Sequence, residues 1–149
     1  MSDEPSFVWT WYGQDEHAWV LASCKVMQCL EFLALEAPEQ AVRICGCPGC
    51  ETWSGKVLPL HGWLEACPGS QVPQFRDALQ KVWALCNELP DAALACYEHD
   101  IYHCEEWEAV RLAARAALAA GGWDSVREHI EGITTTCNRH LLPWGHRPA

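Results

Sequence analysis

The segment from residue 45 to residue 73 constrains this chain most, because it is too irregular to hold its own shape. It contains five glycines and four prolines and shows no hydrophobic periodicity. Three thiols stand together at its start, in Cys45-Gly-Cys47-Pro-Gly-Cys50. A Cys-x-x-Cys pair is the usual half of a tetrahedral zinc site. The segment therefore predicts a domain that folds with the help of a structural zinc ion.

The remaining ligands of such a site must come from elsewhere in the chain. Cys45 and Cys47 are spaced too tightly to reach one ion comfortably, so two or three of the loop thiols are expected as ligands. Candidates for the others are Cys24, Cys29, His61 and Cys67. Two alternatives remain for the loop cysteines, which are packing as small apolar side chains and a redox or disulfide role.

A second group of potential ligands stands in Cys96-Tyr-Glu-His99-Asp-Ile-Tyr-His103. The segment 92–104 fits either a helix or a strand. On a helix, Cys96, His99 and His103 share one face at spacings of three and four residues, which suits a metal ion. The alternative is that these histidines, which stand beside Glu98 and Asp100, are solvated or hydrogen-bonded without a metal.

The fold class predicted from the pattern is mostly α, or α+β if a short hairpin forms around residues 56–60. Apolar residues at helical spacing predict helices over 15–37, 74–89 and 105–120, the last of which stops at Gly121-Gly122. Ser125-Val-Arg-Glu128 matches a capping box and predicts a short helix over 125–132. We expect an aromatic arm over 1–14, one Cys- and His-rich domain over 15–133 and an irregular, basic tail over 134–149.

Charge and composition exclude several classes of function. The net charge is −10, and the small basic group of Arg111, Arg115 and Arg127 stands among glutamates, whereas nucleic-acid binding needs clustered basic residues. No apolar stretch is long enough to span a bilayer. We therefore expect protein partners, and neither nucleic acid nor membrane.

The chain contains ten cysteines, and whether they bind metal or form disulfides depends on the redox state of the cellular compartment. The start Met1-Ser-Asp-Glu-Pro5 lacks the basic and apolar regions of a signal peptide. In an intracellular, reducing compartment, dense cysteine indicates metal more often than disulfides. A secreted domain stapled by five disulfides is the alternative.

Known enzyme motifs are missing from the sequence. His103-Cys-Glu105 begins a deaminase signature, but no Pro-Cys-x-x-Cys follows it, and there is no His-Glu-x-x-His. We expect no enzyme; a stand-alone thiol enzyme or a metal-handling protein is the alternative, because any of the thiols can meet a histidine in the fold. Four tryptophans that flank irregular regions are candidates for a partner-binding patch, although packing over the zinc loop explains them equally: Trp9, Trp11, Trp53 and Trp63.

Four elements then follow one another in a recognisable order over residues 7–107. They are Phe7-Val-Trp-Thr-Trp11 before the helix with Cys24 and Cys29; Cys45-Gly-Cys47-Pro-Gly-Cys50 followed by Ser54-Gly-Lys-Val-Leu58 and Trp63; Gln74-Phe-Arg76; and His99-Asp-Ile-Tyr102 with Trp107. In this order they resemble the adenovirus early-region-four 34 kDa protein family.

The resemblance implies a zinc-binding early viral protein of the host nucleus or cytoplasm. It would act as an adaptor that, with viral and host proteins, links targets to a cullin–elongin ubiquitin ligase. The chain is shorter than the family's usual members and lacks an elongin-binding box, which indicates a shortened member that kept the zinc fold. Combining the resemblance with the spacing, the predicted metal ligands are Cys24, Cys29, Cys45, Cys47, Cys50, Cys96, His99 and His103.

Overall fold

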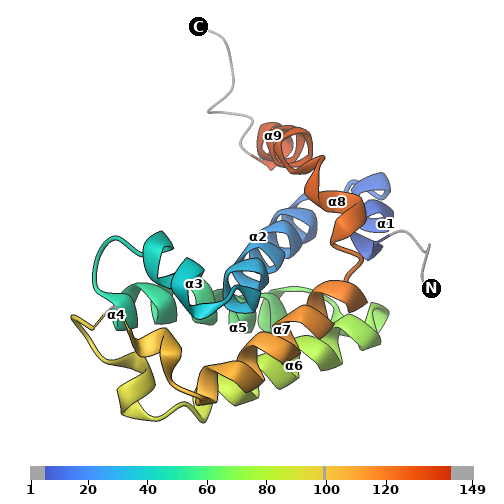
Figure 1. Ribbon diagram of the computed structural model, residues 1–149. Coiled ribbons are helices and arrows are strands. Elements are labelled where there is room, and N and C mark those ends of the chain that lie inside the picture. Colours follow the sequence, from blue (N-terminus) through green and yellow to red (C-terminus); the bar gives the residue numbers. More distant parts are fainter. Residues whose placement is uncertain (1–5, 99, 142–149) are drawn as a thin grey trace, which may run out of the picture.

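The structure, a computed structural model, describes residues 6–98 and 100–141, and within these residues every regular element is helical (Figure 1). The α-helices are α1 (Phe7–Gly13), α2 (His17–Ala34), α3 (Ala37–Arg43), α4 (Pro48–Thr52), α5 (Leu58–Ala66), α6 (Pro73–Asn87), α7 (Glu106–Ala120), α8 (Asp124–Arg127) and α9 (Ile130–Leu141). Shorter elements are a π-helical turn η1 (Trp53–Val57) and the 3-10 turns η2 (Gly69–Gln71), η3 (Asp91–Leu94) and η4 (Ile101–His103). The mostly α fold class predicted from the sequence is confirmed.

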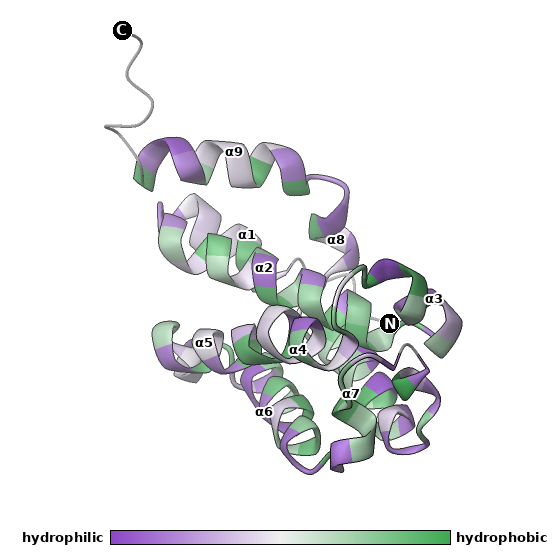
Figure 2. Cartoon of the chain, turned by 90° about the vertical axis from the view of Figure 1, so that its left-hand side faces the viewer, coloured by the Kyte–Doolittle hydropathy of each residue, from purple (hydrophilic) through white to green (hydrophobic). Residues whose placement is uncertain are grey.

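Helix α2 lies at the centre of three helical layers. On one side it packs against α9, and on the other against α5 and α7, with α6 beside α7 (Figures 1 and 2). The buried face of α2 includes Val20, Met27, Leu30 and Leu33, which recur at the spacing that predicted the helix. The apolar residues of all the layers form one continuous core.

The predicted aromatic arm is wrong for residues 7–13, which form α1 and enter the core. Ser6 caps this helix by accepting a hydrogen bond from the backbone N–H of Val8. The Phe7 ring lies 4.9 Å from that of Trp11 and 5.0 Å from that of Phe75 in α6. Aromatic rings of this size contribute more when they are buried against one another than when they stay exposed.

The predicted hairpin around residues 56–60 is also wrong, because α4, η1 and α5 follow one another as one helical stretch. The prolines of this segment do not interrupt its helices. Pro48 and Pro59 both stand in the first turn of a helix, where the missing N–H has no partner to lose. Pro38 likewise opens α3, so the helix predicted over 15–37 ends at Ala34 and a second helix begins at Ala37.

Two predictions near the C-terminus need correction as well. Ser125 lies inside α8 and donates to the carbonyl of Gly122, so the predicted capping box is not formed. Residues 134–141 belong to α9 and not to an irregular tail, because Ile133 and Cys137, one turn apart, are buried where α9 packs on α2. Residues 142–149 lie outside the described part of the chain.

Candidate metal centre

A glycine brings two distant segments of backbone together at α4. Gly49 stands between Cys47 and Cys50, and a Cβ on it would lie 2.0 Å from the carbonyl oxygen of Leu94. Only a residue without a side chain permits this approach. Because Leu94 ends η3, the contact carries the following residues, Ala95 and Cys96, to the start of α4.

The approach assembles three thiols. The sulfur atoms of Cys47, Cys50 and Cys96 all lie within 4.8 Å of one another, and Cys50 Sγ is 3.7 Å from Cys96 Sγ. In a tetrahedral site with zinc–sulfur bonds of about 2.3 Å, two thiolates stand about 3.8 Å apart. A disulfide needs a separation of about 2.05 Å, and all three cysteines are free thiols. The group therefore could hold a metal ion.

Hydrogen bonding moves the pKa values of two of the three thiols in opposite directions. A backbone hydrogen bond from Cys50, followed by a side-chain hydrogen bond from Cys96, lowers the pKa of Cys47 to about 7. Hydrogen bonds to Cys47 and Cys50 raise the pKa of Cys96 to about 11. The cluster thus favours a thiolate at Cys47 near neutral pH, and a cation that binds Cys96 must displace its proton.

Cys96 lies in the connection between α6 and α7, which we define as residues 88–98 and 100–105. Buried hydrogen bonds anchor this connection. The hydroxyls of Thr52 in α4 and Tyr102 lie 2.7 Å apart. The indole N–H of Trp107 donates to the carbonyl of Ala93 at 3.0 Å. These bonds fix the connection against α4 on one side and α7 on the other.

Arg111 in α7 extends this anchoring to the end of α2. Its guanidinium is buried and donates to the carbonyls of Tyr102 and Leu35 and to Gln40 Oε1, and it pairs with Glu108 at 3.1 Å. These acceptors offset the free-energy cost of removing the charged guanidinium from water. The sequence showed Arg111 only as part of a small basic group, with no signal for this role.

Among the described residues, the other predicted ligands do not belong to the cluster. Cys24 and Cys29 are buried in α2, where Cys29 Sγ donates to the carbonyl of Gly55 at 3.4 Å and burial raises the pKa of Cys24 to about 12. Cys45 is exposed beside the cluster and does not belong to it. His103 is exposed at the end of η4, and His99 lies outside the described residues.

The predicted pattern on residues 96–103 needs a correction. The segment is neither one helix nor one strand: a turn at residues 96–97 precedes η4, and Tyr97 has a φ of 66°. A shared helical face for Cys96 and His103 therefore does not exist. What sequence reasoning treated as two separate constellations supplies one cluster, with Cys96 joining the Cys47–Cys50 pair.

Two of the four proposed patch tryptophans lie in the core. Trp11 and Trp63 are each 1 % exposed, and their indole N–H groups donate to Gln71 Oε1 and Ser23 Oγ. Trp9 is half-buried and donates to the carbonyl of Ser125. Trp53 is half-buried, with its ring 5.9 Å from that of Trp83. The prediction of an exposed patch is therefore wrong for Trp11 and Trp63.

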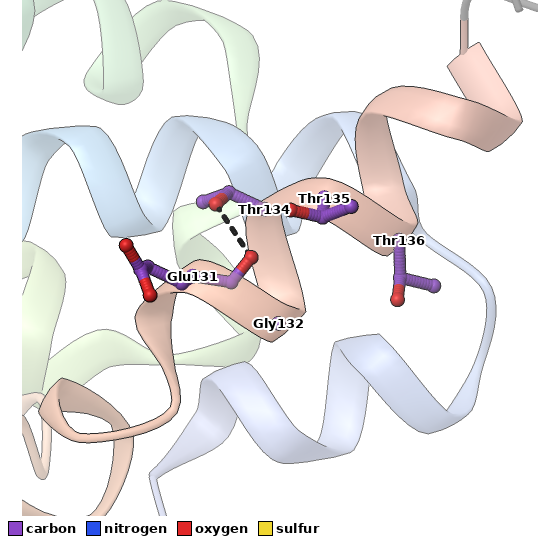
Figure 3. Close-up of a pocket in the computed structure, with 5 residues that line it drawn as sticks. All are labelled: Glu131, Gly132, Thr134, Thr135 and Thr136. Atoms are coloured by element: carbon purple, nitrogen blue, oxygen red, sulfur yellow. Dashed lines mark hydrogen bonds between the residues drawn. The ribbon is translucent and has the colours of Figure 1, made fainter.

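Two hollows on the described surface show no convergent catalytic groups. One is lined by Glu131, Gly132 and Thr134–136, all from α9, and Figure 3 shows Thr136 on the other side of the helix from Thr134. The hydroxyl of Thr134 donates to the helix's own carbonyls. A second hollow, between α1 and the ends of α6 and α7, is lined by uncharged residues.

A comparison of the chain with protein-family models, with curated proteins and with solved structures found no match. Among the described residues, no helix combines the length and the apolar character that crossing a bilayer requires.

Proposed function

We propose that the chain is a zinc-stabilised protein-interaction domain, with Cys47, Cys50 and Cys96 as ligands. The observation that carries the proposal is the sulfur separation of 3.7 Å between Cys50 and Cys96, which matches the edge of a zinc–thiolate tetrahedron of about 3.8 Å. An ion there joins α4 to a connection 46 residues further along the chain. Zinc supplies a link that this irregular region does not obtain from regular helix packing.

An interaction role is supported by two exposed apolar side chains, one of which follows the cluster residue Cys96 directly. Val42 is 79 % exposed in α3, and Tyr97 is 89 % exposed directly after Cys96. Large apolar side chains held at a rigid surface are typical contacts of protein partners. The partner that the resemblance implies is a cullin–elongin ubiquitin ligase of the host, which the chain would link to target proteins as a viral adaptor.

Native mass spectrometry of protein loaded with zinc tests the metal site. We expect at least one zinc ion in the native chain, its loss in Cys96→Ser, and its retention in Cys104→Ser, which changes a half-buried thiol of the same connection outside the cluster. Cys45→Ser and His99→Ala, measured in the same way, identify the fourth ligand. Equal zinc in Cys96→Ser and in the native chain contradicts the assignment.

Size-exclusion chromatography with purified elongin heterodimer tests the adaptor role. Because the chain lacks an elongin-binding box, this association has to use another surface, and Tyr97 is exposed. We expect the zinc-loaded chain to elute with the heterodimer, and Tyr97→Ser to weaken that association without loss of zinc. Separate elution of the zinc-loaded chain at micromolar concentrations contradicts this partner.

A second candidate, a thiol enzyme or metal-handling protein, is favoured by the pKa of Cys47, which is lowered to about 7. The two candidates differ when zinc is bound. A structural site leaves Cys47 unreactive towards iodoacetamide in the zinc-saturated protein, because its sulfur is coordinated. Rapid alkylation of Cys47 under saturating zinc favours the thiol candidate.

A further inference from the structure

One pair of sulfurs in the cluster connects two segments of the fold directly. Cys50 in α4 and Cys96 in the connection are both exposed, and their sulfurs are 3.7 Å apart. A disulfide requires about 2.05 Å, so the two sulfurs must approach by about 1.7 Å. Cys96 lies in a turn outside the helices, where a small shift breaks no helical hydrogen bond.

We propose that Cys50 and Cys96 form a reversible disulfide under peroxide, and that this bond excludes the metal ion. The same two sulfurs serve both states, and a disulfide sulfur is no longer a thiolate ligand. The half of the proposal that concerns metal release rests on the proposed zinc site. Disulfide formation itself rests only on the position and exposure of the two thiols.

The chemistry needs one equivalent of hydrogen peroxide as the two-electron oxidant. The thiolate of one cysteine attacks a peroxide oxygen, the O–O bond breaks, hydroxide leaves, and a sulfenic acid forms. The second thiolate attacks the sulfenic sulfur, the S–O bond breaks, and a second hydroxide leaves as the S–S bond forms. The two hydroxides take up the two thiol protons, so two thiols and one peroxide give one disulfide and two waters.

Cys47 shares the cluster but is half-buried, and the cysteines outside the cluster lack this combination of exposure and a partner. Cys24, Cys86 and Cys137 are buried within the helix layers. Cys45 is exposed but is not a member of the cluster. Oxidation is therefore directed to the cluster, and the resulting bond keeps α4 joined to the connection after the metal has left.

Peptide mapping of the full chain after peroxide treatment tests the proposal. Metal-free and zinc-loaded protein are each exposed to hydrogen peroxide, remaining thiols are blocked, and the digest is analysed by mass spectrometry. We expect a cross-linked pair of peptides that contain Cys50 and Cys96, lighter by two hydrogens and separated again by a thiol reductant. In the zinc-loaded sample, a chelating dye should detect one zinc ion released for each bond.

Two variants control the experiment. Cys96→Ser should lose the cross-link, and Cys104→Ser, in the same connection but outside the cluster, should keep it. A bond between Cys47 and Cys50, or oxidation confined to single cysteines as sulfinic acids, overturns the proposal. Zinc binding without a Cys50–Cys96 bond rejects the redox site and leaves the zinc domain standing, whereas the bond without zinc binding supports the redox site and rejects the zinc domain.

Discussion

The cysteines of the helix layers are buried among apolar side chains, whereas those of the α4 region lie together at the surface. Cys24, Cys86 and Cys137 are buried between α2, α6 and α9 and pack as small apolar side chains. Cys47, Cys50 and Cys96 lie at the surface, where their sulfurs face one another. The contrast teaches that burial and the position of each thiol in the fold, rather than cysteine density, separate packed thiols from candidate ligands.

The largest expected effect is on thiol reactivity in the metal-free protein. Burial raises the pKa of Cys86 to about 12, whereas backbone hydrogen bonding lowers that of Cys47 to about 7. At pH 8 about nine-tenths of Cys47 but about one Cys86 in ten thousand is thiolate, the reactive form. We expect iodoacetamide to label Cys47 much faster than Cys86, with a half-maximal rate for Cys47 near pH 7.

The same shift gives a pH dependence of stability with a definite sign. The folded chain holds the Cys47 thiolate at a lower pH than the unfolded chain, in which the pKa is near 9.0. Its contribution to stability is therefore fully present above pH 9 and disappears as the pH falls through 7. In the labelling experiment, equal rates for Cys47 and Cys86 in folded protein would contradict the distinction between surface and buried cysteines.

The next largest effect is expected at Arg111, where the helix layers meet the connection. Arg111→Leu leaves the carbonyls of Tyr102 and Leu35 and Gln40 Oε1 without a donor. We expect the free energy of unfolding to fall by about 3 kcal/mol, measured in urea.

The matched control is Arg115→Leu, one turn further along α7. Arg115 is exposed and contacts the carbonyl of Ala34 and the carboxylate of Glu36. An exposed pair of this kind contributes about 0–1 kcal/mol. If both variants lose the same stability, Arg111 does not join the two regions in the way that its contacts indicate.

A smaller loss, about 2 kcal/mol, is expected for Gly49→Ala. The new methyl group would overlap the carbonyl of Leu94 and separate α4 from η3. Because the same contact positions Cys96, zinc affinity should fall together with stability. Gly55→Ala adds a methyl group with nothing within 4 Å and should preserve both. Retention of native zinc affinity in Gly49→Ala argues against the role of the close approach.

The smallest effect is expected for Tyr102→Phe, which removes the hydroxyl that bonds to Thr52 at 2.7 Å. The loss should be about 1 kcal/mol, the usual contribution of such a bond. A double-mutant cycle with Thr52→Val should show that most of this loss is shared between the two residues. Tyr97→Phe, at an exposed hydroxyl, is the neutral comparison. Additive losses in the cycle contradict a direct bond.

Long periodic segments were predicted accurately from the sequence, and short ones were not. Helices α6 and α7 begin and end within about two residues of the predicted ranges, since their apolar positions repeat over four turns. The Pro- and Gly-containing segment 45–73 was interpreted as irregular where the chain is largely helical, because Pro48 and Pro59 stand in the first turns of helices. Trp11 and Trp63 were candidates for an exposed patch or for packing, and residue type alone does not reveal that their indoles find hydrogen-bond partners inside the core.

By itself, the sequence determined the helical class, the extent of the long helices and the candidate pair Cys47–Cys50, because each depends on neighbours within a few residues. Only the tertiary structure decided that Cys96 completes the cluster, that Cys24 and Cys29 do not, and that Arg111 joins two regions. The physical reason is that these outcomes depend on a backbone contact between Gly49 and Leu94, 45 residues apart in sequence, which local spacing does not encode.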